Sequence, residues 1–340
     1  MSKHTEDTMI RTRGLTRHFT RHKKTVEAVR GLDLDVHRGE LVAFLGPNGA
    51  GKSTTLRMLT TLVAPTSGTA EVAGYDVVTG QRDVRRSIGY VGQGNAAGHT
   101  QRGRDELVSQ ARAHGLTRQE ASRRADELLE AFELTEHAGR PVSTLSGGQR
   151  RRLDIAIGLV HTPRLLFLDE PSTGLDPQNR ANLQEQIKRL HAESGTTIVL
   201  TTHYLEEADA IADRVVVIDH GLVIADDTAT ALKSGLGDLV TLGFGTVHDA
   251  VMAASAVDSL PTDATVERSG SVVTIRTRGG AEMVPQMVQD LAAADAPVRR
   301  VEVAGPTLDD VFLDLTGRSL RESNNTTDET DAHTSEGAAA

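Results

Sequence analysis

Eight consecutive residues, Gly46 to Ser53, have the types and spacing of a phosphate-binding loop. They read Gly-Pro-Asn-Gly-Ala-Gly-Lys-Ser, which matches the pattern Gly-x-x-x-x-Gly-Lys-Ser/Thr. Glycines let the backbone curl until several N–H groups point at phosphate oxygens, and a following helix adds its free amides. Lys52 would bring a mobile charge to the β- and γ-phosphates, and Ser53 a hydroxyl to Mg²⁺. A Gly-rich turn with a chance lysine is the alternative, which the complete pattern disfavours.

Two acids, Asp169 and Glu170, follow the apolar run 165–168. Carboxylates at the C-terminal end of a buried strand face the crevice where α/β sheets bind ligands. Asp169 is predicted to hold Mg²⁺ through water, and Glu170 to polarise an attacking water. His203 follows another apolar run. Alone it would be an ordinary exposed histidine, but beside these motifs we expect it to contact the γ-phosphate and the water.

Strands and helices alternate around these motifs. Continuous apolar runs predict buried strands at 41–45, 165–168 and 198–201. Helical patterns cover 53–62 and 105–133. A strand pair at a sheet edge is expected at 26–36, and a hairpin is expected at 214–225. The alternation indicates an α/β fold built on a largely parallel sheet.

The composition changes near Ser234–Gly237, and we expect a second domain beyond it. The predicted order there is strand, helix, strand, strand, helix, strand, which is the ferredoxin-like or split βαβ pattern, followed by a helix at 308–315. The expected organisation is a motif-bearing domain at 9–236 with a helical subdomain at about 94–160, a small α+β domain at 237–318, and a disordered polar tail at 319–340.

Composition excludes several classes of function. The chain has 340 residues and no cysteine, so disulfides and thiolate metal sites are excluded. A net charge of −10 argues against a nucleic-acid partner. No apolar run approaches the roughly 20 residues of a membrane helix, and the N-terminus is polar. We therefore expect a soluble chain that stays inside the cell and serves a membrane only through a partner.

The segment Leu145-Ser146-Gly147-Gly148-Gln149 is an element that most phosphate-loop families lack. Together with the loop, the acid pair and His203, in this order and spacing, it resembles the ABC ATPase family over about residues 9–233. The resemblance implies a P-loop NTPase fold with a RecA-like core, an antiparallel β subdomain and a helical subdomain. It also implies a head-to-tail homodimer that holds ATP between one chain's loop and the other chain's signature segment.

The family's site residues carry over individually. Ser146, Gly147 and Gly148 would bind the γ-phosphate of the partner's nucleotide, at a helix N-terminus. Gln93 resembles the glutamine that senses Mg²⁺ and water and reports to the membrane subunit. Asp176 resembles the aspartate that links the two sites.

Further residues complete the expected site. Phe19 occupies the position of the adenine-stacking aromatic, and the less favoured alternative is a core residue of an edge strand. The residues expected at the nucleotide are Phe19, Gly46, Asn48, Gly49, Ala50, Gly51, Lys52, Ser53, Thr54, Ser146, Gly147, Gly148, Gln149 and Asp176. The expected Mg²⁺ ligands are Ser53, Gln93 and Asp169, and the expected catalytic residues are Glu170, His203 and Gln93.

Longer stretches around these motifs, and Pro306 to Leu313, resemble the ATPases of daunorubicin-resistance drug exporters. That type works at the cytoplasmic face of the membrane with a separate permease. A soluble ABC ATPase acting on DNA, ribosomes or metal clusters is the alternative, disfavoured by the single signature and the absence of heptads. A regulatory module without turnover is disfavoured by the intact acids. The basic triplet Arg150–Arg152 is interpreted as a solvated or phosphate-facing helix start.

Overall fold

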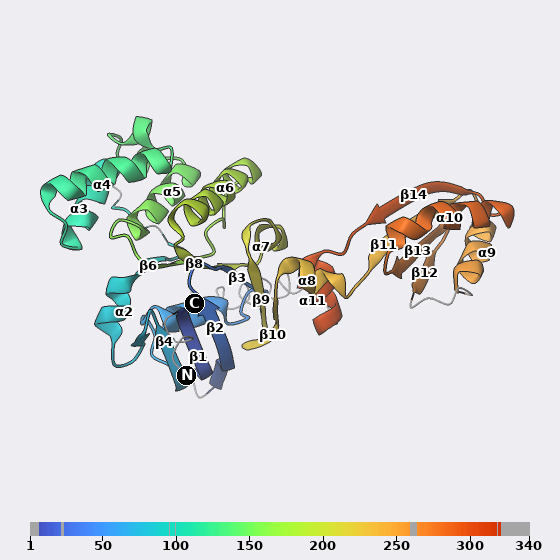
Figure 1. Ribbon diagram of the computed structural model, residues 1–340, viewed down its shortest axis with the longest axis horizontal. Coiled ribbons are helices and arrows are strands. Elements are labelled where there is room, and N and C mark those ends of the chain that lie inside the picture. The colour runs from blue at the N-terminus through green and yellow to red at the C-terminus, as the bar shows by residue number, and fades with distance from the viewer. Residues whose placement is uncertain are drawn as a thin grey trace, which may run out of the picture. The chain divides into compact units, whose positions relative to one another are not determined.

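The computed structural model describes residues 7–21, 24–94, 96–98, 100–258, 264–317 and 319–320 (Figure 1). These divide into two compact units. The first comprises the described residues up to Thr228 together with Leu320, and the second comprises Ala229–Ser319. The tail expected to be disordered lies outside the described residues, apart from Ser319 and Leu320. No helix among the residues described is long and apolar enough to cross a membrane.

A six-stranded sheet forms the centre of the first unit. Its strands, in spatial order, are β10 (Leu222–Asp227), β9 (Arg214–Asp219), β3 (Leu41–Leu45), β8 (Thr197–Thr202), β7 (Leu165–Asp169) and β6 (Ile88–Val91). All neighbours pair in parallel except the hairpin β9–β10. Every residue of β3, β7 and β8 is buried, as the continuous apolar runs predicted. The predicted α/β fold is thus confirmed.

A second, antiparallel sheet packs against the first within the same unit. Its order is β2 (Lys24–His37), β1 (Thr8–Arg21), β4 (Ser67–Val72) and β5 (Tyr75–Asp76). One hydrophobic core joins both sheets to helix α1 (Lys52–Leu59) and includes Ile10, Leu34 and Phe44. The strand pair expected at 26–36 is wrong, because this segment is one long edge strand whose partner is β1.

Helices gather at the far side of the central sheet from β1 and β2 (Figure 1). They are α3 (Gly103–Ala113), α4 (Arg118–Ala131), α5 (Gly147–Gly158) and α6 (Pro177–Ser194), with short 3-10 turns at Thr135–His137 and Val142–Thr144. Smaller helices are α2 (Gln81–Ser87) and α7 (Leu205–Ile211). The helical segment predicted at 105–133 consists of two helices, α3 and α4. Gly115, at φ 94°, ends the first helix, and Thr117 begins the second through a capping box with Glu120.

Helix α5 packs unusually close to the central sheet. A Cβ on Gly89 of β6 would lie 2.2 Å from the carbonyl oxygen of Gly158, at the end of α5. A Cβ on Gly158 would lie 2.9 Å from Val91. Because no larger residue fits at either position, the two glycines fix how near α5 comes to the strand that precedes Gln93.

The second unit is a small α+β layer. Its elements are α8 (Ala229–Ser234), β11 (Asp238–Phe244), α9 (Val247–Asp258), β12 (Thr265–Ser269), β13 (Val272–Thr277), α10 (Gly280–Ala293), β14 (Val298–Ala304) and α11 (Leu308–Thr316). The antiparallel sheet has the order β12-β13-β11-β14. β13 therefore lies between the two strands that α9 connects, and β11 between the two that α10 connects, which is a split βαβ arrangement. Its core includes Val240, Leu242, Ile275 and Leu291.

Candidate functional site

The loop between β3 and α1 is shaped to receive an anion. Gly49 and Gly51 have φ values of 79° and 104°, which favour glycine. A Cβ on Gly46 would lie 2.0 Å from the carbonyl oxygen of Ile218, and one on Gly51 would lie 2.3 Å from that of Ala28. No side chain caps the N-terminus of α1, so its first amides remain available to phosphate oxygens.

Lys52 is held inside this loop. Its side chain is 3% exposed, and Nζ donates hydrogen bonds to the carbonyl oxygens of Gly46 at 2.7 Å and Pro47 at 3.0 Å. Burial lowers the pKa of Lys52 to about 8, although the negative charges of Glu170 and Asp169 oppose the shift. The ammonium is bound by two neutral carbonyl oxygens in place of water. A phosphate would bind it more strongly, because it brings a full negative charge.

Asp169 is the centre of a buried polar cluster. Its Oδ1 accepts hydrogen bonds of 2.7 Å from the hydroxyls of Ser53 and Thr201, while buried Oδ2 has no hydrogen-bond partner among the described residues. Gln93 Nε2 donates to Ser53 Oγ at 3.4 Å. An unpaired buried carboxylate oxygen is costly and fits a cation, and this set of hard oxygen donors suits Mg²⁺.

The described part of the chain contains no cluster of three or more His, Asp or Glu side chains that could hold a metal, at Asp169 or elsewhere. A metal beside Asp169 would therefore take its remaining ligands from water and phosphate, as Mg²⁺ commonly does.

Glu170 stands beside the phosphate loop. Its φ of 46° is strained for a residue with a side chain, and its N–H donates to Thr201 Oγ1 at 2.9 Å. Its Oε1 lies 3.9 Å from Lys52 Nζ and 3.6 Å from His203 Nδ1, and Oε2 accepts a hydrogen bond from Thr173 at 3.2 Å. Burial acts to raise the pKa of Glu170, but His203, Lys52 and Thr173 outweigh it and the pKa falls. Glu170 is thus ionised at neutral pH and can accept a proton or hydrogen bond.

The structure brings half of the predicted residues into one cavity. It has a volume of about 350 Å³ and is lined by Ala28, Asn48, Gly49, Ala50, Gly51, Lys52, Ser53, Thr54, Gln93 and Glu170. Neither Ser146 nor Phe19 lines it. Gly147 lines a smaller neighbouring cavity of about 170 Å³, which also touches Gln93 and Glu170. The loop and the acids are therefore assembled within one chain, whereas Ser146 lies outside its own chain's cavity.

The signature segment begins α5 as a capped helix. Ser146 Oγ accepts the N–H of Gln149 at 3.2 Å, and the Gln149 side chain accepts the N–H of Ser146 at 3.0 Å. A Cβ on Gly148 would lie 2.5 Å from the Asn179 side chain, so this glycine allows α6 to approach. Gly147 has room around it, since its nearest neighbour, Leu175, is 4.0 Å from the Cβ position. Of the two glycines, Gly147 is the one open to a ligand.

Asp176 and Phe19 have local structural partners. Asp176 caps α6, where its Oδ1 accepts the N–H of Asn179 at 3.0 Å. Phe19, on β1, is 39% exposed, which excludes the core position considered from the sequence. The guanidinium of Arg17 lies 4.5 Å above its ring. The ring is therefore on the surface, with one cation already over one of its faces.

Two residues of the site were missed in the sequence. Thr201 contacts both acids because β8 pairs with β7 so that Asp169 lies opposite Thr201. Arg151 donates three hydrogen bonds to backbone carbonyls, at 2.7 Å to Gly92, 3.0 Å to Asp169 and 2.8 Å to Pro171. The solvated or phosphate-facing role expected for the basic triplet is wrong for Arg151, which is buried and ties α5 to both strand ends.

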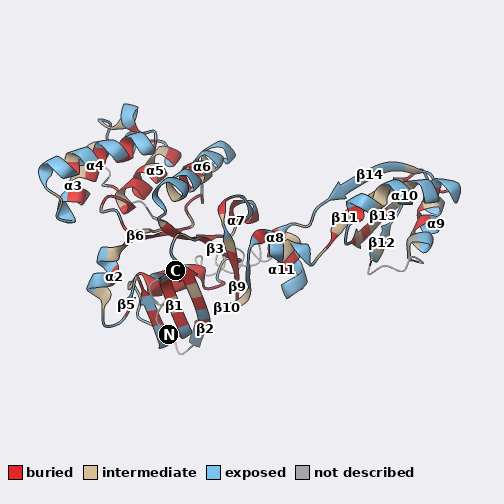
Figure 2. Cartoon of the chain, viewed as in Figure 1, coloured by how far each residue is buried: buried red, intermediate tan, exposed pale blue. Residues whose placement is uncertain are grey.

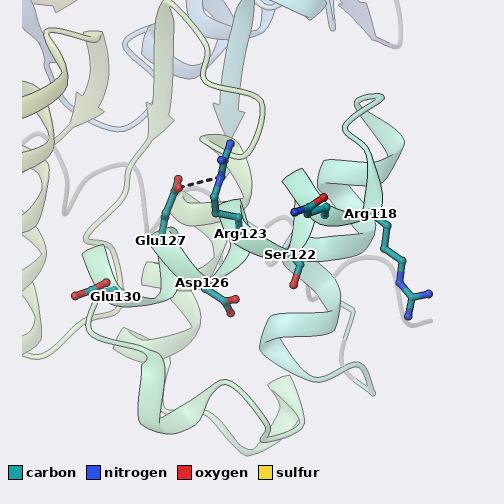
Figure 3. A pocket seen from close by; sticks show the side chains of 7 residues that line it. Arg118, Ser122, Arg123, Asp126, Glu127 and Glu130 are labelled. Carbon is teal, nitrogen blue, oxygen red and sulfur yellow. Dashed lines mark ion pairs between the residues drawn. The ribbon is translucent and has the colours of Figure 1, made fainter.

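A wider hollow lies along α4, away from these motifs (Figure 3). It has a volume of about 720 Å³ and is lined by Arg118, Gln119, Ser122, Arg123, Asp126, Glu127 and Glu130. Three of its charged side chains are paired, since Arg123 lies 3.6 Å from Glu127, and Asp126 lies 2.7 Å from Arg104. All the lining residues belong to one helix, and we interpret this hollow as a solvated charged face.

Known proteins share these features. Residues 29–173 match the family model described as ABC transporter. A daunorubicin resistance ATP-binding protein of Streptomyces coeruleorubidus is 43% identical over 297 residues, 87% of this chain and 93% of that protein. A linearmycin resistance ATP-binding protein of Bacillus subtilis is 37% identical over 302 residues, 88% and 96% of the two chains. The solved structure of a dimeric ATP-binding cassette in a post-hydrolysis state, bound to ADP and Pi, is 26% identical, with a TM-score of 0.60. The match covers 65% of this chain and 98% of that one.

The role of Arg151 can be tested by its effect on stability. Replacing Arg151 with Met removes three charge-assisted hydrogen bonds, and we expect the full chain to lose about 3 kcal/mol of unfolding free energy in urea. Arg152→Met is the matched control, because Arg152 pairs with the exposed Glu133 at 3.3 Å and its loss should cost less than about 1 kcal/mol. Equal losses of unfolding free energy in the two variants would contradict the stabilising role of the buried Arg151.

Proposed function

The chain belongs to the ATP-binding proteins of ABC transporters and is an ATP hydrolase, and we propose that it works in pairs to drive export through a separate membrane subunit. The observation that carries the catalytic part is the shared cavity of the loop, Lys52, Gln93 and Glu170 beside the unpaired carboxylate oxygen of Asp169. A cation, amides and a general base in one space are the components that phosphoryl transfer requires.

Nucleotide binding would rearrange Lys52. In the structure its ammonium is bound by the carbonyls of Gly46 and Pro47. The β- and γ-phosphates would replace these carbonyls, and the amides of the loop and of α1 would bind the remaining oxygens. Phe19 would stack on the adenine, for which its exposed ring is available.

Mg²⁺ would be held by Ser53 and Asp169, with Gln93 beside them. When bound, this ion neutralises charge on the phosphate oxygens. Forming the site needs only small movements, since Ser53 Oγ already lies 2.7 Å from Asp169 Oδ1 and Gln93 Nε2 lies 3.4 Å from Ser53 Oγ. Gln93 would then report the state of the site to the membrane subunit, which is the role that its resemblance to the family's glutamine implies.

Glu170 would orient and polarise the attacking water. Its depressed pKa keeps it ionised, and Thr201 and Thr173 fix its position. His203 lies 3.6 Å from the same carboxylate and would contact the water and the γ-phosphate. The ring of Tyr204, 4.1 Å away, supports it. The catalytic contribution is positioning and electrostatics, with no covalent enzyme intermediate.

Glu170→Gln tests this assignment. The amide keeps the shape of the side chain and loses its charge and basicity, so the variant should bind ATP while turnover falls by at least ~100-fold. ATP should then hold two chains together, which size-exclusion chromatography with Mg-ATP would detect. A variant that hydrolyses ATP at the normal rate would contradict the role of Glu170.

The second half of each site would come from a second chain. Ser146 does not line its own chain's cavity, and a dimeric cassette is among the similar structures. Ser146, Gly147 and Gly148 would bind the γ-phosphate at the N-terminus of α5, with Gln149 holding the serine in place through the capping box. Asp176, at the start of α6, would link the two sites.

Mixing two inactive variants tests whether sites are shared. Lys52→Ala damages the loop, and Ser146→Arg damages the signature, so each homodimer has two damaged sites. In a mixed dimer both lesions fall in one site, and the other site is intact. ATP-dependent pairing should therefore return on mixing, as measured by analytical ultracentrifugation with Mg-ATP. If both variants are folded and Mg-ATP produces no additional association in their mixture, the shared site is wrong.

The transported compound is drug-like or hydrophobic in our proposal. It rests on the similarity to proteins named for daunorubicin and linearmycin resistance, which extends over both units of this chain. The chain would then act at the cytoplasmic face of the membrane through a permease. The alternative, mechanical work on a non-membrane partner, has no comparable support, and the intact acids disfavour a module without turnover.

Fractionation separates the exporter from the alternative. Expressed alone the chain should remain in the supernatant, and expressed with its permease it should move to the membrane pellet, because the described part offers no spanning helix of its own. The Glu170→Gln variant is a control that should fractionate in the same way. Failure of every co-expressed neighbouring permease to retain the chain would contradict the exporter function.

A further inference from the structure

Strand β14 is an open edge of the second unit's sheet. Its described neighbour is β11 alone, and six of its seven residues are exposed, as its pale blue colour in Figure 2 shows. An edge strand leaves a row of backbone N–H and C=O groups ready to pair with another strand.

The apolar row of the core continues onto this edge. In the register with β11, Val301 lies opposite Leu242 and Val303 lies opposite Val240. Leu242 and Val240 are completely buried, so both valines lie on the core side of the sheet. They are nevertheless 38% and 42% exposed. Only a further strand or another chain placed alongside β14 would remove these two side chains from water.

The opposite edge of the sheet carries a charge in its core-side row. On β12 the core-side residue Arg268 lies opposite the buried Val273, and a charge in that row discourages further pairing. β14 contains no proline, and its charged residues Arg300 and Glu302 lie on the other face, where they pair with each other. Its third charged residue, Arg299, falls in a bulge between the pairs Arg300–Gly243 and Val298–Phe244. From Arg300 to Ala304, therefore, the core-side row of β14 carries no charge.

We propose that β14 pairs with β14 of a second copy of this chain, antiparallel and about a two-fold axis at Val301, independently of nucleotide. Residues opposite each other in two antiparallel strands lie on the same face of the sheet. In a symmetric pair, the two-fold axis must therefore pass through a residue position and not between two residues. Centring on Val301 places Arg300 of each copy opposite Glu302 of the other. Centring on Arg299, Arg300 or Glu302 would place that residue opposite itself, and centring on Val303 would pair only residues 302–304, because β14 ends at Ala304. Charge complementarity and the length of the strand thus select a second copy and one register.

This contact goes beyond the ATP-dependent pairing of the cassettes. It involves only the second unit, joins two four-stranded sheets into one, and covers Val301 and Val303. All its tests use the full chain without nucleotide, so their outcome does not depend on the shared ATP site.

A single cysteine tests the register directly, because the natural chain has none. Val301→Cys would place two cysteines opposite each other with Cα atoms about 5 Å apart, within disulfide range. Val303→Cys is the matched control. It has similar exposure, but its two copies would be about 13 Å apart, four residues along the strands, which is too far to bridge.

On mild oxidation the Val301→Cys chain should form a disulfide dimer on a non-reducing gel, and the Val303→Cys chain should not. Met252→Cys, on the exposed face of α9, measures collisional cross-linking. Cross-linking of Val301→Cys no greater than that of Val303→Cys or Met252→Cys would overturn the proposal.

Charge reversal tests the complementarity. Arg300→Glu or Glu302→Arg would each place like charges opposite one another at two positions, and self-association should weaken at least roughly tenfold. An equimolar mixture of the two variants restores opposite charges between copies while the pair within each chain stays broken. Recovery on mixing, by analytical ultracentrifugation, therefore reports the contact between copies. Glu267→Arg on β12 is the control and should leave association unchanged.

A natural chain that stays monomeric without nucleotide in the same experiment, or single reversals without effect, would show that β14 does not pair in this way.

Discussion

The parallel register of β3, β8 and β7 is the constraint on which the nucleotide site depends. Leu45 lies opposite Thr202, and Asp169 lies opposite Thr201. The phosphate loop, the two acids and His203 therefore leave the sheet at the same edge, on strands about 4.8 Å apart. A shift of one residue in the register of β3 with β8, or of β7 with β8, would turn the side chains of the shifted strand to the other face of the sheet. The residues that line the cavity would then no longer meet.

Charges kept out of water are the second feature of the site. Lys52 and Asp169 are 3% and 0% exposed, and each is bound by groups that only partly replace water. Loop carbonyls bind the ammonium, and two hydroxyls bind one oxygen of the carboxylate. Incompletely paired buried charges lower stability in the absence of ligand and strengthen the binding of a partner of opposite charge. Arg151 holds the backbone around them in place.

The second unit is organised by different physical rules. Its sheet has a small apolar core. The two edge strands differ in their core-side residues, since β12 has an arginine there and β14 has two valines. The relatives named for drug resistance match over most of the chain, including this unit. The residues expected at the nucleotide all lie in the first unit, and in our proposal the second unit contributes by contact.

The sequence by itself determined the chemistry and the class of fold. The loop from Gly46 to Ser53 and the capped signature are local patterns, and the buried strands at 41–45, 165–168 and 198–201 follow from continuous apolar runs. The tertiary structure alone decided that Arg151 is buried, that Thr201 joins the two acids, that Gly148 makes room for Asn179, and that two core-side valines are exposed at one edge of the second sheet. These contacts join residues far apart in the chain, and they depend on strand register and helix approach, which no local pattern encodes.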